Sequence, residues 1–319
     1  MNSPAKAWRT AVAGMLVIAM SATAVAAATT ESKTDRDRLI LLGTKGGPSV
    51  RDVDQVPTSN AVVLGKDTYL VDAGYGAALR LVECRIPLTS VRAILLTHHH
   101  SDHNLDVGPL IYSAWTGGLA KPVGVYGPRG VENLVAGYLQ SNAFDMTTRM
   151  QDEGRPDLRR LIDVKTYSEG PVMENERIKV TALKVAHPPI DDSYALKIEV
   201  KGGKTIVFSG DTTYFPPLAV FARNADYLVH EVMYVPALER LTQRSPNAKT
   251  LMKHLLASHT TTEDVGRIAA AAGVKNVVLT HFVPGADPAM HDEQWLEGVR
   301  KHYGGNVVLG RDRLEIPLD

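Results

Sequence analysis

The stretch Thr97-His98-His99-His100-Ser101-Asp102-His103-Asn104-Leu105-Asp106 carries more information than any other part of this sequence. It directly follows the apolar run Val91–Leu96, whose aliphatic residues are typical of a buried β-strand. Four histidines and one aspartate within six residues are hard to explain by packing, because buried imidazoles need polar partners and protonated imidazoles repel one another. Neutral imidazole and carboxylate groups are natural ligands of zinc. The stretch therefore predicts a metal site at the C-terminal end of a strand.

The spacing within this stretch divides its side chains between two ions. His98 and His100 lie two residues apart at the strand end, so both can face one ion. Asp102 and His103 lie at the start of the following helix, where they can face a second, neighbouring ion. His99 lies between two ligands with its side chain pointing elsewhere, and we leave it out of the predicted ligand set.

Length and composition place the chain among ordinary globular proteins. It has 319 residues, of which 44% are hydrophobic and 22% charged, so a sizeable core is available. Its 35 basic residues balance 35 acidic residues, which excludes a strongly basic protein that binds nucleic acid through its net charge. A single cysteine, Cys84, excludes a disulfide scaffold and zinc sites built from several thiolates.

The N-terminal residues have the pattern of a secretory signal peptide. Lys6 and Arg9 precede the apolar run Ala11–Met20, which small residues follow over Ser21–Ala28. The apolar run is too short to span a bilayer, so we expect cleavage and no stable membrane anchor. We predict a signal peptide over residues 1–28, a single domain over residues 29–319, and a periplasmic or secreted protein. Removal of the peptide leaves 33 basic against 35 acidic residues, so the mature protein is slightly acidic.

Beyond residue 30 the pattern alternates between strands and helices. Short runs rich in Val, Ile and Leu predict strands at 39–42, 61–64, 69–71, 91–97, 123–126, 178–185, 194–200, 205–208, 227–229, 276–280 and 306–309. Longer amphipathic patterns predict helices at about 102–115, 130–140, 262–272 and 292–302. This mixture predicts a layered α/β domain. The polar segment Ser141–Gly170 reads as an irregular surface excursion or lid.

The H-x-H-x-D-H pattern of residues 98–103 resembles that of the metallo-β-lactamase fold superfamily of hydrolases. Four downstream or upstream residues match its remaining positions: Asp72, His187, Asp211 and His281. The resemblance implies a four-layer αβ/βα sandwich, in which two mixed β-sheets face each other and helices flank them. It also implies two zinc ions with Asp211 bridging them. Their remaining ligands would be His98, His100 and His187 for one ion, and Asp102, His103 and His281 for the other. Asp72 would support the ligand loop, and a hydroxide shared by the ions would attack the substrate.

Two further segments resemble the ribonuclease Z branch of this superfamily. Val229-His230-Glu231-Val232 is similar to its His-Glu loop, although Val232 and Met233 replace the usual small residue and threonine. Ser258-His259-Thr260-Thr261 is similar to its His-Ser/Thr loop. The resemblance implies that His259, oriented by Glu231, donates a proton to the departing oxygen. The predicted catalytic residues are therefore His259, Glu231 and the ligand Asp102. Purely structural alternatives are an N-terminal helix cap position for His259 and a solvated or hydrogen-bonded loop carboxylate for Glu231.

The sequence departs from the ribonuclease Z pattern where that group grips RNA. The excursion Ser141–Gly170 carries six acidic and five basic residues, which does not suit a phosphate-binding arm. We therefore expect a small anionic ester as substrate and no nucleic-acid partner. An exported arylsulfatase-like family shares the catalytic pattern, so the expected substrate is a phosphodiester or a sulfate ester.

Other interpretations stay open at this stage. A lactone or a β-lactam would also suit an exported site with two zinc ions, and a non-catalytic metal-binding module is a different class altogether. The apolar residues Tyr214, Phe215, Pro216, Pro217 and Phe282 either accept the leaving group or pack in the core. The other histidines, His254, His291 and His302, are expected in surface or packing positions. A homodimer is compatible with the sequence.

Overall fold

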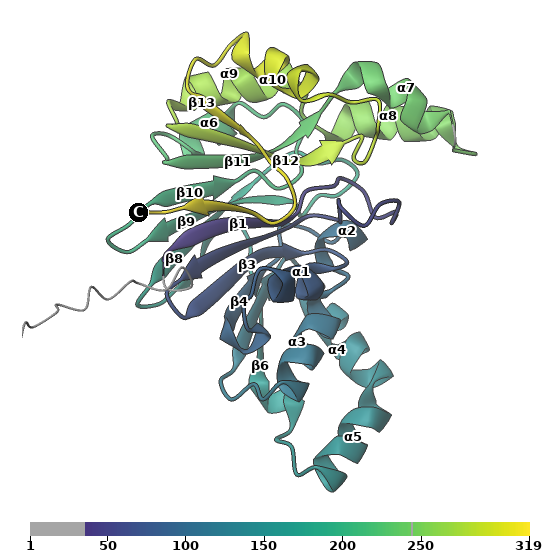
Figure 1. Ribbon diagram of the computed structural model, residues 1–319, viewed down its shortest axis with the longest axis vertical. Helices are drawn as coiled ribbons and strands as arrows, with labels where there is room; N and C mark the ends of the chain where they lie inside the picture. The colour runs from purple at the N-terminus through teal and green to yellow at the C-terminus, as the bar shows by residue number, and fades with distance from the viewer. Residues whose placement is uncertain (1–35, 244) are drawn as a thin grey trace, which may run out of the picture. The chain divides into compact units, whose positions relative to one another are not determined.

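The computed structural model describes residues 36–243 and 245–319 (Figure 1). These residues fall within one compact unit, Ser32–Asp319. The predicted signal peptide, residues 1–28, lies outside the described residues. Within the two described ranges, no helix combines the length and the apolar character that crossing a bilayer requires.

Two seven-stranded sheets form the centre of the unit. The first has the order β14-β1-β2-β3-β4-β5-β6 and the second β13-β12-β11-β10-β9-β8-β7. In each sheet an antiparallel part continues into a parallel part, with β3 to β6 and β10 to β13 running parallel. The strands are β1 Arg38–Gly43, β2 Ser59–Leu64, β3 Asp67–Ala73, β4 Val91–Leu95, β5 Val123–Gly127, β6 Ile162–Thr166, β7 Gly170–Glu174, β8 Ile178–Lys184, β9 Tyr194–Val200, β10 Thr205–Phe208, β11 Tyr227–Met233, β12 Asn276–Val283, β13 Asn306–Leu309 and β14 Leu314–Pro317.

Helices cover the outer face of each sheet, so the unit has four layers. In β4, Leu95 faces the core between the sheets while Ile94 faces the helices; in β12, Val278 and Val277 divide in the same way. This two-residue alternation explains why nearly every strand residue is apolar. The prediction of a four-layer αβ/βα sandwich is confirmed. The helices are α1 Ala77–Glu83, α2 Ser101–Asn104, α3 Val107–Thr116, α4 Val131–Ser141, α5 Ala143–Asp152, α6 Pro217–Phe221, α7 Leu238–Thr242, α8 Ala248–Ser258, α9 Thr262–Ala272 and α10 Asp292–Arg300.

Helix boundaries follow the local signals where those are strong. Helix α9 has the predicted limits: the Thr261 hydroxyl accepts a hydrogen bond from the Asp264 N–H, and Gly273 ends the helix at φ 63°. The helix predicted over about 102–115 is instead two helices, α2 and α3. They separate at Asp106, whose N–H donates to the Ala73 carbonyl and whose carboxylate accepts from the Ala78 N–H. These tertiary bonds break the helix.

The segment Ser141–Gly170 is more regular than its sequence suggests. It contains α5 and the strand β6, which pairs in parallel with β5 at the edge of the first sheet. Arg149 pairs with Asp145 and Glu153 along α5, so three of the segment's eleven charged residues pair with one another there. Figure 1 shows α5 at the opposite end of the unit from α7 and α8. The prediction of an irregular segment is therefore wrong, and α5 lies away from the site described next.

Candidate metal centre

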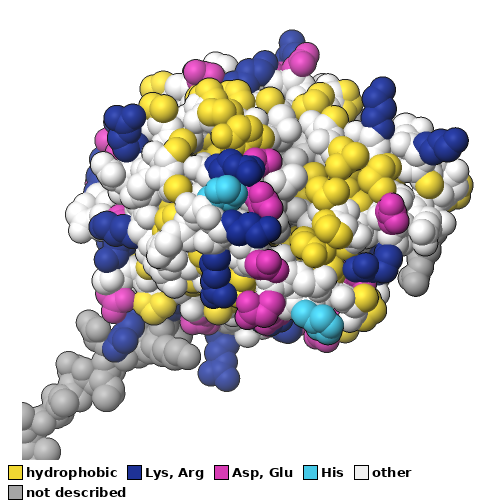
Figure 2. All heavy atoms as spheres, turned by 90° about the horizontal axis from the view of Figure 1, so that it is seen from above, with side chains coloured by type: hydrophobic (Ala, Val, Ile, Leu, Met, Phe, Trp, Pro, Cys, Tyr) yellow, Lys and Arg dark blue, Asp and Glu magenta, His cyan; other side chains and the backbone are white. Residues whose placement is uncertain are grey.

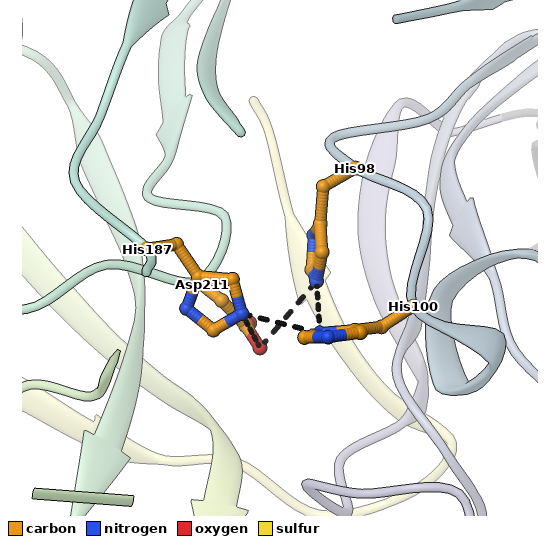
Figure 3. Close-up of side chains that lie close together, drawn as sticks. All are labelled: His98, His100, His187 and Asp211. Atoms are coloured by element: carbon orange, nitrogen blue, oxygen red, sulfur yellow. Dashed lines mark hydrogen bonds and ion pairs between the residues drawn. The ribbon is translucent and has the colours of Figure 1, made fainter. Parts of the chain in front are cut away.

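The seven predicted ligands meet at one edge of the sandwich, where strands from both sheets end. His98 and His100 follow β4, Asp102 and His103 lie in α2, His187 follows β8, Asp211 follows β10, and His281 lies in β12. Their ligand atoms form two groups: His98, His100, His187 and Asp211 in one, and Asp102, His103 and His281 in the other. Figure 3 shows the first group, with His98 and His100 approaching from one side and His187 and Asp211 from the other.

In the first group, imidazole nitrogens face one another at short range. His100 Nδ1 lies 3.0 Å from His98 Nε2 and 3.1 Å from His187 Nε2. Four ligands bound about 2.1 Å from one zinc ion are spaced by roughly 3.4 Å, so this set is slightly tighter than a zinc site. Burial holds the pKa of His98 well below its usual range and lowers the pKa of His187 to about 4, so both rings are neutral.

Hydrogen bonds behind these rings fix which nitrogen carries the proton. His187 Nδ1 lies 2.9 Å from the Ser258 carbonyl and must donate to it. The Thr97 hydroxyl donates to Asp72 and therefore accepts from His98 Nδ1 at 3.0 Å. The Nε2 lone pairs of both histidines consequently point toward His100 Nδ1, which has at most one proton to donate. Converging lone pairs repel unless a cation lies between them, so this group fits a metal ion.

Asp211 connects the two groups through a single carboxylate oxygen. Its Oδ2 lies 3.8 Å from His98 Nε2 in the first group, and 3.4 Å and 3.2 Å from the Nε2 atoms of His103 and His281 in the second. Among the described residues, Asp211 Oδ1 and His103 Nε2 have no hydrogen-bond partner although both are buried. Burial alone would raise the pKa of Asp211, but His281 and His103 hold it well below its usual range. An ionised, under-coordinated carboxylate in this position suits a bridging ligand.

The second group carries an excess of negative charge. Asp102 Oδ2 lies 3.4 Å from His281 Nε2 and accepts a 2.7 Å hydrogen bond from the Gly47 N–H. Burial opposes protonation of His103, but the carboxylates of Asp211, Asp72 and Asp102 together raise its pKa well above the usual value. The field that favours a proton on this imidazole equally favours a divalent cation.

Two of these residues adopt backbone conformations that non-glycine residues rarely take. Asp72 has φ 62° and His281 has φ 45°, both in the left-handed region. The Asp72 carboxylate accepts 2.8 Å hydrogen bonds from the Thr97 N–H and from His103 Nδ1. Asp72 thus fixes both the start of the ligand loop and the tautomer of a ligand, which is the supporting role implied by the resemblance.

Replacing Asp72 with Asn should weaken metal binding by roughly 10- to 100-fold, as for other residues that orient metal ligands. The amide cannot accept from both Thr97 and His103, so His103 would turn to the tautomer that protonates Nε2. Titration against a chelator would measure the affinity. Asp67→Asn, at the start of the same strand, is the matched control, and equal affinities for the two variants would contradict the assignment.

His259 and Glu231 form a buried pair beside the ligands. His259 Nδ1 lies 2.8 Å from Glu231 Oε2, while Glu231 Oε1 accepts from the Thr212 N–H at 2.8 Å. Burial, then the Asp211 carboxylate, raises the pKa of Glu231 well above its usual value, and burial lowers the pKa of His259. Both shifts favour a pair with no net charge, in which one proton lies between Glu231 and Nδ1 and another on Nε2 of His259. The pair can therefore release a proton from Nε2.

The secondary structure around these two residues differs from that expected from the sequence. Glu231 does not lie in a loop but within β11, where the flanking Val232 pairs with Phe282. His259 follows the last residue of α8, and Thr261, not His259, caps α9. The N-terminal cap position considered for His259 is therefore wrong; His259 is instead the C-terminal cap of α8, where its N–H donates to the Leu255 carbonyl.

A cavity of about 350 Å³ opens onto the ligands. Ligands from both groups line it, together with His259. Its apolar wall comes from α7, α8 and β12 through Leu241, Leu251, Leu255 and Val283. Lys45 and Arg51, from the loop between β1 and β2, also line it.

This lining decides one open alternative and adds two residues to the site. Of the two alternatives for Phe282, core packing is the one observed, since its ring packs on Trp295 with ring centroids 4.9 Å apart; Tyr214, Phe215, Pro216 and Pro217 are absent from the described lining. His254, expected at the surface or in packing, lines the cavity on α8, with its ring centroid 6.2 Å from that of His259. Lys45 also lines the cavity although no sequence pattern indicates it, and burial lowers its pKa to about 8. The spacing of five residues between His254 and His259 was the signal in the sequence that could have placed His254 near the site.

Comparisons with known proteins agree with this geometry. Residues 67–282, more than half of the chain, match the family described as "Beta-lactamase superfamily domain". Ribonuclease Z of Mycolicibacterium paratuberculosis is 29% identical over 282 residues, covering 88% of this chain and 97% of that protein.

Solved structures show the same fold. The metallo-β-lactamase fold protein YhfI from Bacillus subtilis superimposes with a TM-score of 0.64 at 20% identity, covering 88% of this chain and 99% of that one. The short form of human tRNase Z superimposes with a TM-score of 0.60 at 18% identity, with the same coverage of 88% and 99%. With the family match and the convergent His and Asp groups, these findings confirm the suspected superfamily. The chain belongs to the β-lactamase superfamily and is a metal-dependent hydrolase of the metallo-β-lactamase fold.

Proposed function

We propose that this protein is an exported hydrolase with two zinc ions that cleaves small phosphodiesters or sulfate esters. The observation that carries the proposal is the position of Asp211 Oδ2, within 3.8 Å of His98 in one ligand group and 3.2 Å of His281 in the other. One carboxylate oxygen between two histidine-rich groups suits a pair of ions that share a ligand.

The proposed ligands are those that the sequence predicts. His98, His100 and His187 would hold one zinc ion, Asp102, His103 and His281 the other, and Asp211 both. When bound, such ions supply Lewis acidity that lowers the pKa of a water molecule and polarises an ester oxygen. Asp72 and Gly47 keep the ligand side chains in orientation through their hydrogen bonds to His103 and Asp102.

Proton delivery to the departing oxygen falls to His259. Glu231 holds Nδ1 of this ring at 2.8 Å, so Nε2 is the nitrogen left for the cavity. A substrate oxygen within hydrogen-bond reach of Nε2 would receive its proton as the ester bond breaks. Esters with poor leaving groups need this proton most, which favours phosphodiesters and sulfate esters over strained lactams.

The charge pattern of the face drawn in Figure 2 and the size of the cavity support a small substrate over nucleic acid. On the face shown in Figure 2, basic and acidic side chains are interspersed, with no continuous basic stripe among the side chains drawn there. The segment 141–170 holds α5 and β6 and pairs its own charges. The cavity of about 350 Å³ is at the small end of the usual range for ligand pockets.

A substrate panel on the metal-replete protein tests this function. We expect turnover of an aryl phosphodiester or an aryl sulfate to exceed that of an acyl-homoserine lactone, a cephalosporin and a precursor tRNA. Elemental analysis should find close to two transition-metal ions per chain. Preferred cleavage of the lactone or cephalosporin would support attack on a carbonyl instead, cleavage of the tRNA would support the activity named in the ribonuclease Z relatives, and no cleavage at all would support a non-catalytic metal-binding module.

Export is tested separately from activity. Cells that express the full chain should place the protein outside the cytoplasm, with an N-terminus near residue 28. An intact N-terminus in the cytoplasmic fraction would contradict export and leave the chemistry unaffected.

A further inference from the structure

We infer that the hairpin of α7 and α8 is the recognition site for the leaving group, and that it selects esters whose departing alcohol or phenol is apolar. This inference rests on the proposed function and names the substrate class of the same site: an anionic ester head at the ligand groups with one apolar aryl or short alkyl substituent on the hairpin. No resemblance in the sequence points to these residues.

The first support is the continuity of the cavity between the ligands and α8. Leu251 and Leu255 precede His259 by eight and four residues, a helical spacing that puts them on the side of α8 near this histidine. Both line the same cavity as His259 and the ligand Asp211. Leu255 belongs to a small apolar cluster with Leu238 and Val283, against which Leu251 packs. The wall is thus a packed surface rather than an isolated side chain.

The second support is the direction in which the leaving group must depart. Glu231 fixes His259 by its Nδ1 atom, at 2.8 Å, so the proton donor faces the cavity. The departing oxygen has to approach that donor, and its carbon substituent then lies against the helix that ends at His259. An apolar substituent meets leucine side chains there, whereas a charged one would lose its hydration without a partner.

The third support is the contrast between the two flanks of the cavity. The loop with Lys45 lies beside the second ligand group, since Gly47 donates to Asp102 and a Cβ on Gly46 would lie 2.9 Å from His281. The Lys45 ammonium is held by the carbonyls of Gly46 and Gly47, so its charge is fixed near the ligands. Positive charge on this flank and leucines on α8 match a substrate with an anionic head and an apolar tail.

Helix α8 provides its own control. Leu256, next to Leu255, is 48% exposed and is absent from the described lining of the cavity. Leu251→Ser and Leu256→Ser therefore make the same chemical change on the inner and outer sides of one helix.

The test compares two ester series with matched leaving-group acidity. One series carries a nitrophenyl leaving group, and the other a nitrophenyl group that bears an additional carboxylate. Leu251→Ser should lower kcat/KM for the apolar series roughly 10-fold, a usual size for lost contact in an apolar pocket, and should change the charged series little. Leu256→Ser should leave both series unchanged. Each variant must match the parent protein in metal content and melting temperature. If Leu251→Ser folds poorly, Leu241→Ser, on α7, takes its place and should show the same effect.

Equal losses in the Leu251 and Leu256 variants, or equal losses on both series, would overturn the inference. If the parent protein cleaves neither ester, the proposed function fails, and binding decides the inference alone. Calorimetry with 4-nitrophenol on the metal-replete protein should then show binding that Leu251→Ser weakens and Leu256→Ser does not. Absence of binding to the parent protein would overturn the inference.

Discussion

The Asp211→Asn variant is expected to lose metal from both ligand groups and to lose about 10³-fold or more in kcat. Removal of a shared ligand deprives the reaction of several kcal/mol of charge stabilisation, and each 1.4 kcal/mol corresponds to tenfold in rate. Asp211 is 2% exposed, so no water replaces its charge easily. Elemental analysis and steady-state kinetics on the same preparation would measure both effects.

The structure explains why both groups should respond to this one substitution. Asp211 Oδ2 lies 3.9 Å from His187 Nε2 and 3.2 Å from His281 Nε2, which belong to different groups. An amide at this position lacks the negative charge of the carboxylate. One of its two terminal atoms is also an NH2 donor instead of an oxygen that could bind a metal ion. Asp163→Asn, exposed on the edge strand β6, is the matched control and should keep full metal and activity. Loss of metal from one group only would contradict a bridging position for Asp211.

The His259→Ala variant is expected to lose roughly 10²- to 10⁴-fold in kcat while it keeps its metal content. His259 can give up the Nε2 proton because Glu231 holds Nδ1. The loss should therefore be largest for esters with poor leaving groups and should shrink as the leaving group becomes more acidic. A series of aryl esters with graded phenol acidity would measure this dependence.

The control for this variant must separate proton transfer from metal binding. His259 forms a possible ligand group with Asp211 and His281, so elemental analysis has to accompany the kinetics. His302→Ala, at an exposed histidine that follows α10, should change neither quantity. A uniform loss across the leaving-group series, or a loss of metal equal to the loss of activity, would remove His259 from proton donation.

Local sequence signals predicted most strands of the two sheets, although β6, β7 and β14 were not predicted. Apolar runs such as Val91–Leu96 identify strands because periodicity and composition act over a few residues. The ligands could be placed because each follows or ends such a run, and the resemblance then assigned them to groups. Asp211, for example, comes shortly after the last residue of β10, Phe208.

Features that depend on packing between distant segments were harder to predict. Glu231 was expected in a loop, but β11 continues through it because Met233 pairs with Val283 of β12. Helix α8 was not predicted, and which of its faces meets the cavity depends on how the hairpin packs on β12. Only the structure shows that His254 and Leu251 line the cavity. Phe282 is adjacent to the ligand His281 in sequence, but its side chain lies on the opposite side of β12, in the outer core.

The division of the proposed ligands between the two sheets has a consequence for the stability of the folded chain. His98, His100, Asp102 and His103 belong to the N-terminal half, which builds all of the first sheet except β14, and His187, Asp211 and His281 to the C-terminal half, which builds the second sheet. Any ion held by both halves would act as a cross-link between residues at least 87 positions apart, with the restraint on the unfolded chain that a long-range disulfide would give. A chain with one cysteine has no disulfide of its own for this purpose. Metal bound at this centre would thus add a cross-link to the apolar core that the two sheets already share.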